Sequence, residues 1–184
     1  RDLDGDGTFH QTRDRTIIGN GLPKWIFGLT NNFTFRDFDL SIFLQGVQGN
    51  DIFNSTFYDL LGGDPGGNQL RDYYDNAWRP NSPSDKYWAP RQWEQYGRVS
   101  SYYVENGSFV RLKNINLGYR IPIKSTVFKQ ARVYISGQNL MTFTKYRGYD
   151  PEVNSDFNSN TLYGFDRYAY PASKTITIGG TFTF

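Results

Sequence analysis

The first residues of the chain carry side chains that could hold a metal ion. In the opening stretch RDLDGDGTFH, Asp2, Asp4 and Asp6 stand at alternate positions, and Gly7 follows them. Carboxylates spaced in this way, around a turn that glycine permits, are typical of the first half of a calcium-binding loop. The pattern therefore predicts a structural Ca²⁺ site near the start of the chain.

The remaining ligands of such a site are less regular. A calcium loop of this type ends on a bidentate glutamate, but Arg13 stands where that glutamate is expected. We expect Asp14 to replace the glutamate and the backbone carbonyl of Thr8 to supply a further oxygen. The alternative interpretation is an Asp-Gly turn at the tip of a loop, with no bound ion.

Aromatic residues are the second feature that could bind a ligand, and they make up 18% of the chain. Tyrosine and tryptophan gather in 46–107 and 146–170, where flat rings beside Asn, Asp and Arg could stack on sugars or contact a partner protein. The residues that we predict to contact a substrate or partner are Trp78, Trp88, Trp93, Tyr73, Tyr74 and Tyr149. The alternative, which we favour for most rings, is that they pack the loops together.

The sequence offers no convincing catalytic group. His10 is the only histidine, and it has no paired nucleophile or base. Asp150 and Glu152 could do acid–base work, but Pro151 and the nearby Arg147 favour a turn with a local ion pair. Cysteine is absent, which excludes disulfides and cysteine metal ligands. We therefore predict that the chain is not an enzyme and requires no cofactor, with Ca²⁺ as a possible structural ion.

Charge and hydropathy argue against nucleic acid as a partner and against a membrane-spanning helix. The net charge of +2, from 20 basic and 18 acidic residues, gives no strong field toward nucleic acid. No apolar run approaches the ~18 residues of a membrane-spanning helix, and the mean hydropathy is −0.63. Neither observation excludes a membrane barrel, because its strands are apolar on one face only.

A two-residue period dominates the rest of the chain and predicts β-strands. The alternating stretches are WIFGLTNNFTF (25–35), FDLSIFLQG (38–46), NINLGYRIP (114–122), ARVYISGQN (131–139) and TITIGGTFTF (175–184). Phe35 and Phe38 flank the dipeptide Arg36-Asp37, and both belong to the apolar set. Because a two-residue turn pairs its flanking residues on one face, the two alternations agree across a hairpin.

Short and long connections alternate along these strands. The short turns lie near 36–37 and 122–130, and the long loops lie near 1–23, 46–107 and 146–170. This alternation is typical of outer-membrane barrels, which have short periplasmic turns and long extracellular loops. We therefore predict an all-β fold, a segment of an antiparallel transmembrane β-barrel, with apolar faces toward lipid and polar faces toward the lumen. The alternative is a secreted carbohydrate-binding β-sandwich, whose apolar faces would form a core.

Three stretches then narrow the family. In order and spacing, NGSFVRLKNINLGYRIP (106–122), YISGQNLMTFTKYRGYDPEV (134–153) and YPASKTITIGGTFTF (170–184) resemble the C-terminal segments of SusC/RagA-type TonB-dependent outer-membrane transporters. DLDGDG near the start and AWRPNSPSDKYWAPR (77–91) also fit, so the resemblance spans essentially the whole chain. The final strand, ending on Phe184, resembles the signal that outer-membrane barrel proteins present to their assembly machinery.

The resemblance implies an architecture and a function. Residues 1–184 would form about the last five strands of a barrel of about 22 strands, and the plug and N-terminal domains are absent from them. The whole transporter would import oligosaccharides, or peptides in some members, across the bacterial outer membrane. Its partners would be a SusD-like surface lipoprotein and TonB. This chain would contact the rest of the barrel, the plug, lipid, the lipoprotein and the substrate, but no nucleic acid.

Overall fold

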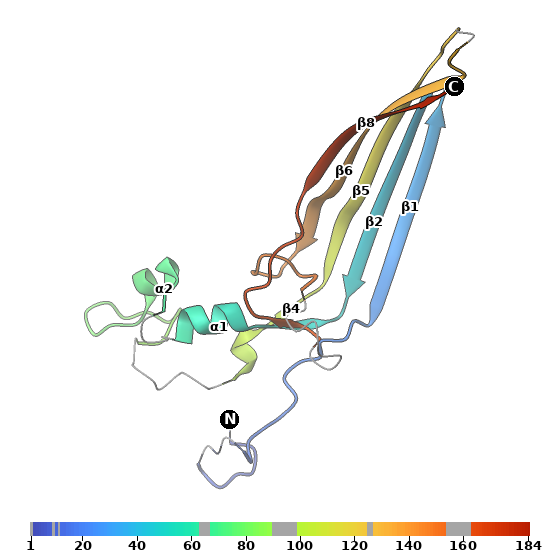
Figure 1. The fold of residues 1–184 in the computed structure, drawn as a ribbon. Helices are drawn as coiled ribbons and strands as arrows, with labels where there is room; N and C mark the ends of the chain where they lie inside the picture. The colour runs from blue at the N-terminus through green and yellow to red at the C-terminus, as the bar shows by residue number, and fades with distance from the viewer. Residues whose placement is uncertain are drawn as a thin grey trace.

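The structure is a computed structural model that describes residues 2–8, 10, 12–62, 67–89, 99–124, 127–153 and 163–184. Its main feature is a five-stranded antiparallel sheet in the order β1-β2-β5-β6-β8, here called the wall sheet (Figure 1). The strands are β1 (Trp25–Phe35), β2 (Phe38–Gln48), β5 (Phe109–Ile121), β6 (Gln130–Thr144) and β8 (Thr175–Thr183). The prediction of long, alternating antiparallel strands is confirmed.

The β1–β2 hairpin has the register that the sequence predicts. Phe35 pairs with Phe38 around the two-residue turn formed by Arg36 and Asp37. Arg36 adopts a left-handed backbone conformation with a φ of 54°. Tight two-residue turns use such a conformation because it matches the twist of the flanking strands.

The two ends of the wall sheet differ in the length of their connections. The β1–β2 turn, the described residues of the 122–129 connection and the end of β8 lie together at one end, here called the short-turn end (Figure 1). The connections from β2 to β5 and from β6 to β8 lie at the opposite end, the long-loop end. The described parts of both long connections between strands of the wall sheet therefore lie at the same end.

Strands β5 and β6 extend beyond the predicted ranges 114–122 and 131–139. The prediction was too short because a bulge interrupts the alternation on which it rested. The register of β5 shifts between Leu112 and Asn114 against both neighbouring strands, which leaves Lys113 as an extra residue opposite β2. On β6 the irregularity falls at Asn139, whose φ is 52°. A bulge of this kind changes which side chains face each side of the sheet, so a strict two-residue period ends there.

One face of the wall sheet is apolar and exposed. A row of paired residues across all five strands consists of Phe33, Leu40, Leu117, Ile135 and Ile178. Ile178 is 80% exposed and Phe33 is 56% exposed, so no described part of the chain covers these side chains. The sandwich alternative, which requires them to form a buried core, is therefore wrong.

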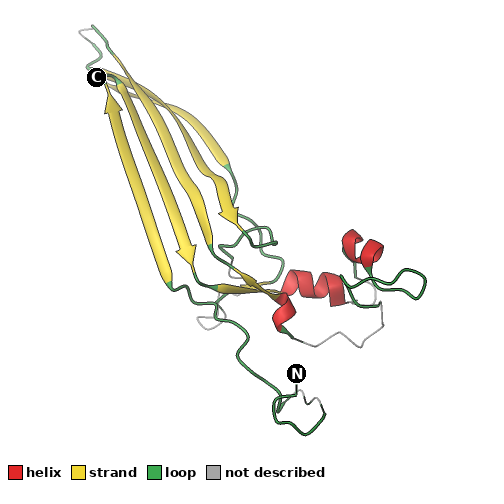
Figure 2. Ribbon diagram, turned by 180° about the vertical axis from the view of Figure 1, so that it is seen from behind, coloured by secondary structure: helices red, strands yellow, loops and turns green. Residues whose placement is uncertain are grey.

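The long connection 46–107 contains regular structure that the sequence analysis did not predict. Its elements are β3 (Asp51–Asn54), α1 (Ser55–Gly62), α2 (Arg71–Asn76), the 3₁₀ turn Ser101–Tyr103 and β4 (Val104–Asn106). A second sheet, here called the small sheet, has the order β4-β3-β7 and takes β7 (Phe165–Asp166) from the later loop. These elements and the described residues that join them within 51–106 form the loop unit, which lies beyond the long-loop end of the wall sheet (Figure 2).

Aromatic rings form the core of the loop unit. Its buried residues are Phe57, Leu61, Tyr73, Ala77, Tyr87 and Tyr103. Several rings meet edge to face, a preferred arrangement for aromatic pairs; the Tyr58 and Tyr103 centroids are 5.0 Å apart at an interplanar angle of 85°. The loop unit thus has a hydrophobic core separate from the wall sheet. Neither α1 nor α2, the helices of the described part of the chain, has the length and composition of a membrane-spanning helix.

Candidate functional site

The polar face of the wall sheet carries an ion pair that links β2, β5 and β6. Arg132 on β6 donates from Nε to Asp39 Oδ1 on β2, and from Nη2 to Asn116 Oδ1 on β5, both at 2.9 Å. The guanidinium can cross β5 because Gly118 has no side chain; a Cβ there would lie 2.2 Å from Arg132 Nη2. Charged and amide groups on this face suit an aqueous lumen, whereas the opposite face suits lipid.

Nearer the long-loop end, Arg111 lies on the same polar face and is only 1% exposed. Its Nε donates to Thr142 Oγ1 at 3.0 Å, its Nη1 donates to Glu152 Oε2 at 2.9 Å, and its Nη2 donates to Asp150. Glu152 also accepts from Lys113 Nζ at 2.9 Å. Charged partners therefore surround a buried cation, which is the condition under which proteins tolerate one.

The expected ion pair of the Asp150–Glu152 turn with Arg147 is wrong. Arg147 instead donates from Nη2 to Glu105 Oε1 at 3.0 Å, and its guanidinium lies 4.0 Å from the ring centre of Phe57. The true partner, Arg111, is 39 positions from Asp150. Sequence reasoning missed Arg111 because no local pattern connects residues so far apart, and because Arg111 precedes the strand that the alternation predicts at 114–122.

The Asp150 carboxyl is charged despite its burial. Burial raises its pKa, but the N–H groups of Ala172 and Glu152 and the guanidinium of Arg111 lower it by more, so the pKa lies below the usual range. The amide of Ala172 donates to Oδ2 and that of Glu152 to Oδ1, both at 2.9 Å. Asp150 thus joins the wall sheet to both ends of the loop that follows β6.

The predicted substrate or partner residues fall into two groups. Tyr73 is 2% exposed in the core of the loop unit, with its ring centroid 5.5 Å from that of Tyr87, and the half-buried Trp88 lies 6.3 Å from Tyr73. The exposed members are Tyr74 (64%), Trp78 (41%) and Tyr149 (80%). Trp93 lies outside the described residues. The structure does not gather the whole set into one surface.

Tyr87 links the aromatic core to a carboxylate. Its hydroxyl donates to Asp72 Oδ2 at 2.6 Å. Burial raises the pKa of Tyr87 to about 12, and the hydrogen bond to the Asp72 carboxylate acts in the same direction. Burial also raises the pKa of Tyr103 above its ordinary value. At neutral pH these phenols are therefore protonated, and the core of the loop unit carries no tyrosinate charge.

Three of the predicted metal ligands come together at the start of the chain. Asp2, Asp4 and Asp14 each place a carboxylate oxygen within 4.8 Å of the other two. Converging carboxylates suit a hard cation such as Ca²⁺. The backbone amides of His10 and Leu3 also donate hydrogen bonds to the Asp14 carboxylate, and these bonds lower its pKa, with that of His10 contributing most.

Asp6 does not join this group, whereas the backbone carbonyl of Thr8 stays a predicted ligand. The side chain of Asp6 lies 3.0 Å from His10 Nε2, and its Oδ1 accepts from the amide of Thr8 at 2.9 Å. Arg13 Nη1 lies 3.7 Å from Asp4 Oδ2 and 3.6 Å from Asp6 Oδ2. The guanidinium therefore offsets part of the negative charge on which cation binding would depend.

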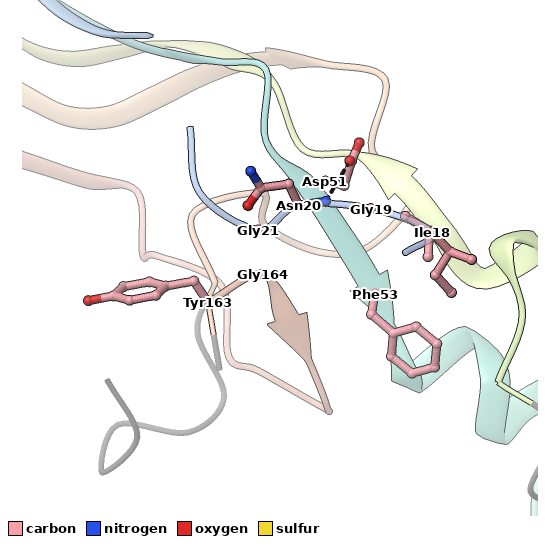
Figure 3. A pocket seen from close by; sticks show the side chains of 9 residues that line it. Ile18, Gly19, Asn20, Gly21, Asp51, Phe53, Tyr163 and Gly164 are labelled. Atoms are coloured by element: carbon pink, nitrogen blue, oxygen red, sulfur yellow. Dashed lines mark hydrogen bonds between the residues drawn. The ribbon is translucent and has the colours of Figure 1, made fainter. Parts of the chain in front are cut away.

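A shallow pocket of about 170 Å³ opens where residues 18–21 cross β3 (Figure 3). Asn20 and Asp51 exchange hydrogen bonds there: the Asn20 amide donates to Asp51 Oδ2 at 2.9 Å, and the Asp51 amide donates to Asn20 O at 2.8 Å. Gly164, with a φ of 74°, permits the close crossing, because a Cβ would lie 2.4 Å from Asp51 O. The pocket thus marks the place where the segment before β1 is fastened to the small sheet.

Comparisons with known proteins agree with this architecture, although no family model matches the chain. TonB-dependent receptor P3 of Formosa agariphila is 40% identical over 185 residues, which cover 97% of this chain and 18% of that protein. TonB-dependent receptor SusC of Bacteroides thetaiotaomicron is 29% identical over 187 residues, which cover 100% of this chain and 17% of that protein.

A solved structure shows the same arrangement of strands. The RagAB peptide importer in the closed-closed state matches 97% of this chain and 20% of its own chain, with a TM-score of 0.75 and 25% identity. The chain therefore spans about a fifth of the length of the proteins that it matches. Receptors of the SusC/RagA type are outer-membrane proteins. This chain belongs to the SusC/RagA-type TonB-dependent transporters, and its wall sheet is a segment of their β-barrel.

Proposed function

We propose that this chain forms part of the barrel wall and of the extracellular mouth of an importer in the bacterial outer membrane. The observation that supports the proposal is the division of the wall sheet into two faces. Exposed side chains such as Ile178 form one face, and the Arg132–Asp39 pair lies on the other. Barrel strands between lipid and an aqueous lumen require this division.

The proposed activity is TonB-dependent import of oligosaccharides or peptides, in cooperation with a SusD-like surface lipoprotein. The relative SusC is a TonB-dependent receptor, which supports the coupling to TonB, and the RagAB complex is a peptide importer, which supports peptides as one substrate class. TonB itself would act through parts of the whole transporter outside residues 1–184. This chain would supply wall and loops and carry out no covalent chemistry.

The loops at 46–107 and 146–170 are the proposed contact surface for substrate and lipoprotein. Tyr74 and Trp78 are exposed on the loop unit, and the Arg79 guanidinium lies 5.0 Å from the centre of the Tyr74 ring. Exposed Tyr, Trp and Arg side chains are the residue types that contribute most to protein interfaces. Tyr149, on the second loop, is a further exposed ring of the same kind.

Deleting residues 60–100 from the full-length transporter tests this assignment. We expect the barrel to assemble, because the wall sheet lies outside the deletion, while lipoprotein co-purification and substrate uptake are lost. A sharper variant is Tyr74→Ala with Trp78→Ala, which removes exposed rings and leaves the core of the loop unit intact. If lipoprotein binding and uptake were unchanged in the deletion variant, the proposed role of this loop would be wrong.

The aspartate group at the start of the chain is a separate proposal. We propose that Asp2, Asp4 and Asp14 hold Ca²⁺ as a structural ion that orders the first loop. The support is the convergence of three carboxylates within 4.8 Å and the preference of Ca²⁺ for such oxygens. The ion would have no catalytic role.

A further inference from the structure

The turn that follows β6 folds back over the polar face of the wall sheet. Gln45 on β2, Arg111 on β5 and Thr142 on β6 are paired neighbours in one row across that face. Glu152 reaches this row, because it accepts from Gln45 Nε2 at 3.3 Å and from Arg111 Nη1 at 2.9 Å. The turn at 149–152 therefore covers the lumen side of three strands instead of extending away from them.

The contacts of this turn are strong because they are charged and shielded from water. The side chains of Arg111 and Asp150 are 2% and 7% exposed, and they form a direct ion pair. Removing one member of a buried pair leaves the other charge without compensation, which costs much more than losing a surface ion pair. The bond from Arg111 Nε to Thr142 Oγ1 also fixes the orientation of the guanidinium.

The returning end of the same loop is held at the same place. The Ala172 amide donates to Asp150 Oδ2 at 2.9 Å, and Asn139 Nδ2 donates to Ser173 O at 3.1 Å. Asn139 belongs to the β6 bulge, so the irregular part of the strand supplies one of the contacts. Both ends of the 145–174 connection are thus bonded to the wall sheet or to the turn that covers it.

We infer that Arg111 is a positioning residue that locks the 149–152 turn onto the lumen wall, making this turn a fixed part of the channel mouth. The turn narrows the passage and presents the exposed ring of Tyr149 from a held backbone. Opening and closing at the long-loop end must then come from other segments. The inference goes beyond the proposed function, since it concerns the mobility of the turn in the absence of any substrate or partner.

A nitroxide spin label at position 149 measures this mobility in the full-length transporter in detergent or lipid. The chain contains no cysteine, so Tyr149→Cys introduces the only labelling site in these residues, and cysteines elsewhere in the transporter would be replaced. We expect a slow, immobilised spectrum with Arg111 present. In Arg111→Met, we expect the ratio of mobile to immobilised label to rise about 10-fold or more, the factor typical of losing hydrogen bonds to a charged group.

Two controls separate positioning from general stability. Lys113→Met removes a half-exposed partner of the same Glu152 carboxylate, and we expect a change of less than about three-fold, as for exposed ion pairs. A label at Tyr74→Cys, on the loop unit, should be unaffected by Arg111→Met. If labels at 149 and 74 gained mobility equally, or if label 149 did not change, the inference would be overturned.

A second variant covers the case in which Arg111→Met fails to assemble. Arg111→Lys keeps the positive charge but loses the forked geometry that bonds Thr142, Asp150 and Glu152 together. We expect an intermediate mobility at position 149 for this variant. A spectrum identical to that of the parent protein would show that charge alone suffices and that the fork does not position the turn.

Discussion

Arg132 reaches Asp39 only by crossing β5 above Gly118. The ion pair therefore depends on the absence of a side chain at position 118. The nearest atom to a Cβ at position 118 would be Nη2 of Arg132, the end of a flexible side chain. Any side chain at this position must therefore displace the guanidinium from Asp39 and Asn116 or move the strand. The glycine is required by a neighbour on the next strand, and its own backbone conformation is ordinary.

We predict that Gly118→Ala destabilises the barrel by about 1–2 kcal/mol, because it weakens a charge-assisted hydrogen-bond network between strands. Urea unfolding of the full-length transporter in lipid would measure the change. Gly180→Ala is the matched control, because its Cβ would meet nothing closer than 3.4 Å, an ordinary contact with Phe182. Equal effects of the two substitutions would contradict the explanation.

The aspartate group gives a second prediction at this scale. Ca²⁺ should slow protease cleavage within residues 2–14 of the calcium-stripped transporter, by about 10–100-fold at a hundred-fold excess over Kd. Asp4→Asn removes one of the three converging carboxylates and should abolish most of the effect. Asp85→Asn, an exposed aspartate outside the group, should retain it. Protection that is equal in both variants would place the ion elsewhere.

At the scale of elements, what the sequence predicted followed from periodicity, and what it missed followed from contacts between distant residues. The β1–β2 hairpin was predictable because the alternation is unbroken up to the turn at 36–37. The strand segment before Lys113 was missed because the bulge changes the face on which its side chains lie. The loop unit was missed because its rings pack by tertiary contact, and short helices such as α2 lack a recognisable period.

The aromatic core of the loop unit also predicts a response to alkaline pH. Tyr87 has a folded pKa of about 12, above the ordinary value of 10.0. Its contribution to stability is therefore fully present below pH 10 and is lost as the pH rises through about 12. We expect a late step in the tyrosinate absorbance that coincides with loss of near-ultraviolet circular dichroism from the loop unit.

Tyr87→Phe removes the hydroxyl that donates to Asp72 while keeping the ring. We expect this variant to lose the component of the late absorbance step near pH 12 and about 1 kcal/mol of loop-unit stability, the usual size of one hydrogen bond. Tyr170→Phe, at a position that is 97% exposed, should leave the late step in place. An unchanged titration curve in Tyr87→Phe would contradict the assignment.

At the scale of the whole molecule, the five strands of the wall sheet leave backbone hydrogen-bonding groups at their edges and an apolar face that the sheet alone cannot cover. Among the described residues, no strand pairs with the outer edge of β1 or of β8, and no element covers the exposed apolar face. Open edges and an uncovered apolar face promote association between chains. The sheet therefore requires neighbouring strands and lipid to be stable.

We predict that residues 1–184 expressed without detergent form aggregates, and that detergent or lipid is needed to keep them dispersed. Size-exclusion chromatography with light scattering would measure the state of association. A monodisperse monomer that melts cooperatively in plain buffer would contradict the membrane assignment. Substituting Ile176 and Ile178 by Thr should reduce aggregation, because it makes part of the apolar face polar.

The parallel pairing of β3 with β7 has a consequence for the timing of biogenesis. Phe53 stacks on Phe165 with ring centroids 5.7 Å apart, and a hydrogen bond from the Tyr168 amide to Thr56 Oγ1 spans 112 positions. A ribosome releases β3 long before β7, so the small sheet cannot close until four strands of the wall sheet have been synthesised. Until β7 has been synthesised, the ring of Phe53 therefore lacks its stacking neighbour, and exposed apolar surface of this kind makes an incompletely folded chain prone to association.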